Sequence, residues 1–148
     1  MTDPTPDAVD RVRLVDLRET PLDVGEVLDA LGDEAAGGLV LFVGRVRDHD
    51  GGRGVDGLDY SAHPGARERL AEVCRRVASD HDVHGVAAVH RVGTLEVGDV
   101  AVVVATTSAH RGTSFEASRV LIDTLKSEVP IWKHQRFTDG TEEWVGSP

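Results

Sequence analysis

Residues 100–137 read VAVVVATTSAHRGTSFEASRVLIDTLKSEVPIWKHQRF, and their pattern predicts a strand, a helix and a second strand in succession. A β-rich apolar run at 99–107 is typical of a buried strand. The capping-box spacing of Thr113–Glu116 predicts the start of a helix, and Pro130 predicts its end. A second β-rich run follows at 131–137. The expected apolar stripe of the helix is Phe115, Ile122, Leu125 and Val129.

Strand and helix signals continue on both sides of this stretch. Downstream, Asp139-Gly140 between the stretches 131–137 and 141–145 is a strong hairpin signal. The remaining elements expected in chain order are a strand at 11–17, a helix after Asp23, a buried strand at 39–43, a loop at 48–54, a strand at 55–61, a helix at 66–79, a strand at 85–92 and a turn-rich connection at 93–99. Mixed order with hairpin-type connections predicts an α+β fold. Residues 1–10 are expected to be a flexible tail and residues 11–148 a single domain.

Composition excludes several classes of protein. The 148 residues carry a formal net charge of −10, which disfavours general nucleic-acid binding. The longest apolar run, 100–105, is far shorter than the roughly 18 residues that a membrane-spanning helix needs. The single cysteine, Cys74, lies among apolar residues at helical spacing and is expected in the core. We expect a cytoplasmic protein, because a single cysteine cannot form an internal disulfide. We expect no metal site, because no His or Cys motif has the spacing of metal ligands.

The cations of the chain are chosen unevenly. Fourteen of the 16 basic residues are Arg, and the only lysines are Lys126 and Lys133. An amine has a tunable pKa and can exchange a proton, whereas a guanidinium cannot, which offers a reason for lysine at these two positions. The alternative is a salt-bridged helix surface, in which the nearby cations pair with acids three residues away.

Two further cationic stretches suggest an anion pocket. Arg45 and Arg47 alternate at the end of the expected strand 39–43. His110 and Arg111 lie between a strand and a helix, where backbone N–H groups already favour an anion. An exposed strand end remains the alternative for the first pair.

Several motifs together resemble the molybdopterin synthase catalytic (large) subunit family. They are, in chain order, Phe42-Val-Gly-Arg-Val-Arg47, His63-Pro-Gly, His90-Arg-Val-Gly-Thr-Leu-Glu-Val-Gly-Asp99, Thr107-Ser-Ala-His-Arg111 and Leu125-Lys126 through Pro130-Ile-Trp-Lys133. They keep the order of the family and cover roughly 38–145. The combination of Ser-Ala-His-Arg with two lysines seven residues apart before a hairpin is specific.

The resemblance implies a fold, a reaction and partners. The fold is α/β hammerhead-type with an additional antiparallel β subdomain. The protein would be a homodimer, and a heterotetramer with a small ubiquitin-like subunit whose C-terminal Gly-Gly carries a thiocarboxylate. Sulfur would pass from this thiocarboxylate to cyclic pyranopterin monophosphate and form the dithiolene of molybdopterin. The step needs no cofactor or metal of its own.

The resemblance also implies site residues. Lys126 and Lys133 would be catalytic and would also bind substrate. The remaining substrate-binding positions would be Arg45, Val46, Arg47, His110, Arg111, His134 and Gln135. His110 and Arg111 would hold the anionic end of the substrate, in their own pocket or in that of the neighbouring protomer. The family often has an acidic residue where this chain has Gln135.

Two other functions fit the same residues. A non-catalytic pterin- or anion-binding module would keep the pocket without turnover. A purely structural subunit would assemble in a way that is indifferent to changes at Lys126 or Arg111. The retention of both lysines in a chain that otherwise uses Arg argues for the enzyme.

Overall fold

The computed structural model describes residues 8–145, with side chains from Asp10 onward. Its elements are α1 (Ala8–Arg11), β1 (Val12–Arg18), α2 (Val24–Ala30), β2 (Gly38–Arg45), β3 (His49–Asp50), β4 (Arg53–Ala62), α3 (Ala66–Asp80), β5 (Gly85–Arg91), β6 (Gly93–Glu96), β7 (Val100–Ser108), α4 (Arg111–Glu128), β8 (Ile131–Phe137) and β9 (Glu142–Val145). This mixed order confirms the α+β class. Of the expected tail, residues 1–7 lie outside the described residues, and residues 8–10 instead begin helix α1.

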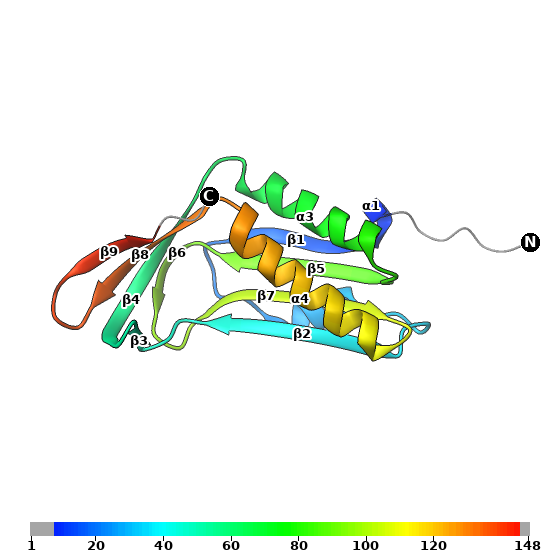
Figure 1. Cartoon of the computed structure of the whole chain (residues 1–148), viewed down its shortest axis with the longest axis horizontal. Coiled ribbons are helices and arrows are strands. Elements are labelled where there is room, and N and C mark those ends of the chain that lie inside the picture. Colours follow the sequence, from blue (N-terminus) through cyan, green and yellow to red (C-terminus); the bar gives the residue numbers. More distant parts are fainter. Residues whose placement is uncertain (1–7, 146–148) are drawn as a thin grey trace, which may run out of the picture.

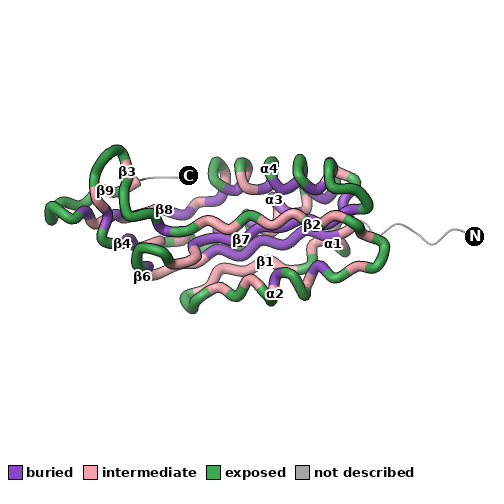
Figure 2. The backbone as a smooth tube through the Cα atoms, turned by 90° about the horizontal axis from the view of Figure 1, so that it is seen from below, coloured by how far each residue is buried: buried purple, intermediate pink, exposed green. Residues whose placement is uncertain are grey.

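The larger layer is a four-stranded sheet in the order β1-β5-β7-β2. Strand β1 runs parallel to β5, and the other two pairs are antiparallel. Helices α3 and α4 cover one face and α2 covers the other (Figure 1; Figure 2). The two central strands are buried along almost their whole length, because both of their faces are covered.

A second, antiparallel sheet lies at one end of the first (Figure 1). Its order is β3-β4-β8-β9, and β6 also pairs with β4, further along that strand than β3. The predicted hairpin is confirmed: β8 pairs with β9, and Gly140 between them has a φ of 86°, which glycine adopts without strain. Helix α4 connects the two sheets, because it starts after β7 and ends just before β8.

Strand β2 differs from its prediction. The apolar run 39–43 was expected to be buried, but β2 is an edge strand of the four-stranded sheet. Leu39 and Phe42 are 38% and 41% exposed. A β-rich run specifies a strand but not which neighbours cover it, so burial could not be predicted from the run alone.

Two segments expected without strands contain them. Within the expected loop 48–54 lies β3, which pairs with β4 around a tight turn at Gly51 and Gly52, both with positive φ. Within the turn-rich connection 93–99 lies β6, which pairs with β4. The glycines correctly predicted the turns in these two segments. The short strands beside the turns were not predicted, because glycine-rich segments are typical of loops.

Helix α4 begins earlier than its capping-box pattern predicts. The first helical residue is Arg111, and His110 is the N-cap, without a side-chain hydrogen bond to the first turn. Thr113 therefore lies inside the helix, and the capping-box prediction is wrong. The strand β7 ends at Ser108, so the helix starts almost directly after it.

The buried face of α4 is also different at its beginning. Phe115, expected in the apolar stripe, is 61% exposed. Ser114 and Ser118 are buried in its place and donate hydrogen bonds to the carbonyl oxygens of Gly38 and Val40, at 2.8 and 3.1 Å. The predicted stripe residues that do pack in or against the core are Ile122, Leu125 and Val129. Small hydroxyl residues let the helix lie close to β2 while satisfying backbone acceptors.

The core confirms the prediction for Cys74, which is fully buried on α3. Burial raises the pKa of its thiol to about 12, so the thiolate does not form near neutral pH. Among the described residues, none of the helices is both long and apolar enough to span a bilayer.

Candidate functional site

Three adjoining cavities open at the junction of the two sheets. Their volumes are ≈ 140, 180 and 400 Å³. Tyr60 of β4 and Lys126 of α4 line all three. Lys133 lines the first two, and Arg45 and Arg47 line the second and third. The five side chains come from four segments of the chain, so the site exists only in the folded protein.

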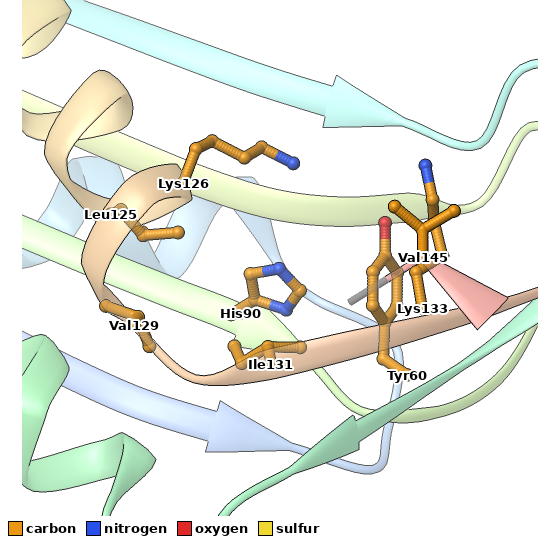
Figure 3. Close-up of a pocket in the computed structure, with 8 residues that line it drawn as sticks. All are labelled: Tyr60, His90, Leu125, Lys126, Val129, Ile131, Lys133 and Val145. Atoms are coloured by element: carbon orange, nitrogen blue, oxygen red, sulfur yellow. The ribbon is translucent and has the colours of Figure 1, made fainter. Parts of the chain in front are cut away.

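The end of α4 brings the two lysines together. Lys126 lies in the last turn of the helix, whose negative end favours a cation. Pro130 ends the helix, and the chain continues directly into β8, which carries Lys133. Both ammonium groups point toward the same cavity, beside the hydroxyl of Tyr60 (Figure 3).

Lys126 is open to solvent through the cavity but surrounded by its walls. This partial burial lowers the pKa of Lys126 below its usual value, and the charge of Lys133 lowers it further. An amine in this position exchanges its proton closer to neutral pH than a surface lysine does. The structure brings both lysines to one cavity, and their catalytic role stays a prediction.

The segment after β2 brings two guanidinium groups to the cavity. Arg45 and Arg47 are exposed, and Val46 between them is buried with Leu58 and Leu95. The backbone N–H of Val46 donates to Asp99 at 3.0 Å, and its carbonyl accepts from Gly98 at 2.8 Å. The buried valine thus fixes the segment and leaves both exposed cations at the cavity, where Arg47 lies 3.7 Å from Asp50.

Strand β8 divides its predicted site residues between two faces. Lys133 and Gln135 line the cavity, and alternation along the strand puts His134 on the opposite side. There His134 stacks on Trp144, with ring centroids 4.4 Å apart, and lies 3.6 Å from Glu142. The structure therefore places His134 outside the cavity wall.

His110 and Arg111 are far from the lysines of their own chain. Both are exposed at the start of α4 and line none of the three cavities. The 18 residues of α4, at about 1.5 Å each, put ~27 Å between its ends. Within one protomer, the structure does not join the His-Arg pair to the pocket.

Three cavity residues were missed by the sequence argument: Tyr60, His90 and Asp50. Tyr60 is the only tyrosine of the chain and is the cross-strand partner of Lys133. The available signal was this single tyrosine in a strand next to a turn. Asp50 gave no signal, because an acid in a glycine-rich loop is ordinary.

His90 is a buried polar residue at the floor of the first cavity (Figure 3). Its Nδ1 lies 2.6 Å from the carbonyl oxygen of Arg91, which can only accept, so Nδ1 carries the proton. Its ring packs edge-on against Tyr60, with centroids 4.9 Å apart. Burial lowers the pKa of His90 to about 4, and the charge of Lys126 contributes to the lowering. The imidazole is therefore neutral at physiological pH.

The arrangement favours binding and chemistry on an anion. Four cationic side chains surround a cavity with one carboxylate, Asp50, in a chain whose overall charge is negative. Arginine forks suit phosphate and carboxylate groups, and lysines can move protons. Among the described residues, no group of three or more His, Cys, Asp or Glu side chains could hold a metal ion.

Comparison with known proteins assigns the chain to a family. Residues 17–128 match the family model described as MoaE protein. The chain belongs to the MoaE family. The molybdopterin synthase catalytic subunit 1 of Mycobacterium tuberculosis is 44% identical over 131 residues, which are 88% of each chain. The molybdopterin synthase catalytic subunit of Halalkalibacterium halodurans is 39% identical over 88% of this chain and 83% of its own.

A solved structure of the MoaE family agrees with the fold. The crystal structure of molybdopterin synthase from Staphylococcus aureus superposes with a TM-score of 0.82 at 29% identity. The match covers 90% of this chain and 97% of the other. The two proteins therefore share this fold over most of their length.

Proposed function

We propose that this chain is the catalytic subunit of a molybdopterin synthase, a sulfurtransferase of molybdenum cofactor biosynthesis. Sulfur passes from the C-terminal thiocarboxylate of a small ubiquitin-like subunit to cyclic pyranopterin monophosphate, forming the dithiolene. The observation that carries the proposal is the cationic cavity of this MoaE-family chain, with its only two lysines in the wall. The substrate is a phosphate ester, and such a cavity attracts it into an acidic protein.

The cavity residues divide the work by their chemistry. Arg45 and Arg47 bind the phosphate, held in place by the buried Val46 between them. Lys126 moves protons, because its lowered pKa makes it release one more readily than a surface lysine does. Lys133 stabilises negative charge as the thiocarboxylate attacks. Gln135 orders the cavity wall beside Lys133.

The sulfur comes from outside the chain. Cys74 is the only cysteine, it is fully buried in the core, and its pKa is raised to about 12. A thiol in this state is neither accessible nor ionised, so it cannot carry sulfur to the cavity. A thiocarboxylate tail that enters the open cavity supplies the sulfur instead. A free buried thiol also suits a cytoplasmic protein.

The chain works as a homodimer, and as a heterotetramer with two small subunits. The large exposed apolar side chains on β2 and on the neighbouring α4 are Leu39, Phe42, Phe115 and Val120. Exposed apolar side chains near an unpaired strand edge are suited to a second copy of the chain. Dimerisation gives His110 and Arg111 a use, since the start of α4 in one protomer can serve the pocket of the other.

A sulfur-transfer assay tests the function. The purified chain is mixed with a thiocarboxylated small subunit and cyclic pyranopterin monophosphate, and the dithiolene product is followed over time. Product from the wild-type chain and none from Lys126→Ala is the expected result. A folded wild-type chain that binds the small subunit but forms no product would instead be a non-catalytic module.

A further inference from the structure

Asp50 is the only carboxylate among the residues that line the three cavities, within the part of the chain that the structure describes. The four cations beside it are Arg45, Arg47, Lys126 and Lys133. Removing one negative charge from such a cluster changes the proton affinity of every amine in it. Asp50 therefore has more influence on the cavity than a carboxylate on the open surface would have.

Asp50 joins two walls of the cavity. It is the last residue of β3, just before the Gly51–Gly52 turn. Its Oδ2 accepts a hydrogen bond of 2.7 Å from Nε2 of Gln135 on β8. Its Oδ1 lies 3.7 Å from the guanidinium of Arg47, which follows β2.

Gln135 is placed to transmit this contact. Its side chain is only 3% exposed, and it lies two residues beyond Lys133 on the same face of β8. A buried amide that loses its acceptor becomes an unsatisfied polar group, so Gln135 and Asp50 hold one another in position. The pair fixes the strand that carries Lys133.

We propose that Asp50 is the positioning carboxylate of this pocket: it aligns Arg47 and the Lys133 face of β8 for sulfur transfer, and its negative charge is required for that alignment. The inference rests on the proposed function.

The surroundings of Asp50 keep it charged. Facing it are Gln135 and Lys133 from β8, Arg47 from the segment after β2, and His49 on its own strand. The hydrogen bond from Gln135 is the largest influence and lowers the pKa of Asp50 below its usual value, with further lowering from Lys133, Arg47 and His49 against the opposing effect of burial. The group is therefore ionised at every pH where the enzyme is expected to work.

Two isosteric substitutions separate charge from shape. Asp50→Asn removes the charge but keeps an oxygen that accepts from Gln135. The double variant Asp50→Asn/Gln135→Glu returns the carboxylate to the other side of the same hydrogen bond. Asp56→Asn is the matched control, because Asp56 is exposed on β4 and lines none of the three cavities.

The readouts are kcat/KM for cyclic pyranopterin monophosphate, the pH–rate profile and the melting temperature. We expect Asp50→Asn to lower kcat/KM on the order of tenfold, because the contacts to Gln135 and Arg47 remain but lose the strength that the negative charge gives them. We expect the limb of the profile set by the cavity amines to move to lower pH, since their charged forms lose a neighbouring carboxylate. The double variant restores both, and Asp56→Asn changes neither.

Other results overturn the inference. Asp50→Asn with wild-type kcat/KM and an unmoved pH profile means that the charge is not needed. A folded double variant as slow as Asp50→Asn means that the negative charge does not act through this hydrogen bond. Absence of product from wild type and Asp56→Asn alike would count against the proposed function itself, and so is distinguishable from both.

Discussion

The first and last turns of α4 carry cations in very different surroundings. At the start, His110 and Arg111 are exposed and line none of the three cavities. At the end, Lys126 lines all three, and the walls around it lower its pKa. One helix thus has an open end and a crowded end. The comparison shows that the surroundings of a cation set its proton affinity. Here the antiparallel sheet packs beside the end of α4 and encloses Lys126, whereas, in the part of the chain that the structure describes, no second element encloses the start of the helix.

The largest expected effect is at the crowded end. Lys126→Ala should lower the sulfur-transfer rate by about 10²–10⁴-fold, the usual contribution of a positioned acid or base. Lys126→Arg should be nearly as slow, because a guanidinium keeps the charge but does not release its proton. The assay compares both with Arg119→Ala, an exposed cation of the same helix that pairs with Asp123. Wild-type rates in Lys126→Arg would mean that charge alone suffices.

The next prediction asks whether the open end of α4 works in the neighbouring protomer. Arg111→Ala and Lys126→Ala homodimers should each be slow. Unfolding and refolding the two together makes mixed dimers, in which one pocket has both its own Lys126 and the partner subunit's Arg111. Random pairing of the two variants should restore about a quarter of the wild-type rate.

The control for that mixture is a sample in which the two purified variants are combined without refolding. If mixed dimers, confirmed by mass, are no faster than this control, Arg111 does not act across the interface. The open end of α4 would then have a structural role only.

The sequence predicted the crowded end better than its surroundings. Lys126 and Lys133 were identifiable because lysine is rare in this chain, and Pro130 between them predicted the turn that brings them together. The sequence argument missed Tyr60 and Asp50, since they reach the cavity from β4 and β3 through pairings between strands that are distant in the sequence. Short strands within glycine-rich segments carry too few residues for a periodic signal.

The side of a strand or helix on which each side chain lies was harder to predict. His134 follows Lys133 directly, yet strand alternation turns it away from the cavity. Phe115 was expected in the core because it is large and apolar, but close packing of α4 on β2 selected Ser114 and Ser118. Both errors come from tertiary context, which overrides residue type when two elements approach closely.

Acid should destabilise the crowded end first. His90 has a folded pKa of about 4 against 6.5 in the unfolded chain, so the unfolded state binds more protons between these values. Stability is therefore complete above pH 6.5 and falls as the pH drops to 4. The loss from this group is about 3 kcal/mol.

His90→Gln isolates the contribution of the imidazole, because glutamine can donate a hydrogen bond but does not titrate. Urea unfolding at several pH values from 7 to 4 should give a clearly smaller loss in the variant than in wild type. Equal slopes for both proteins would show that His90 does not control the acid response, and that the carboxylates of the surface ion pairs do.

The smallest effects come from matched glycine-to-alanine substitutions near each end. At Gly57, close to the cavity on β4, a Cβ would lie 2.9 Å from the carbonyl oxygen of Leu95 and 2.8 Å from the guanidinium of Arg136. The backbone oxygen cannot move without disturbing the β4–β6 pairing, so Gly57→Ala should cost about 1–3 kcal/mol. At Gly112, in the first turn of α4, a Cβ meets nothing within 4 Å, and Gly112→Ala should stabilise by about 0.5–1 kcal/mol. Urea unfolding of both variants measures the pair. We expect changes of opposite sign in the free energy of unfolding, because the start of α4 is open and the cavity end is crowded. A loss of stability in Gly112→Ala would show that the start of α4 is already covered, as it would be beneath a second copy of the chain.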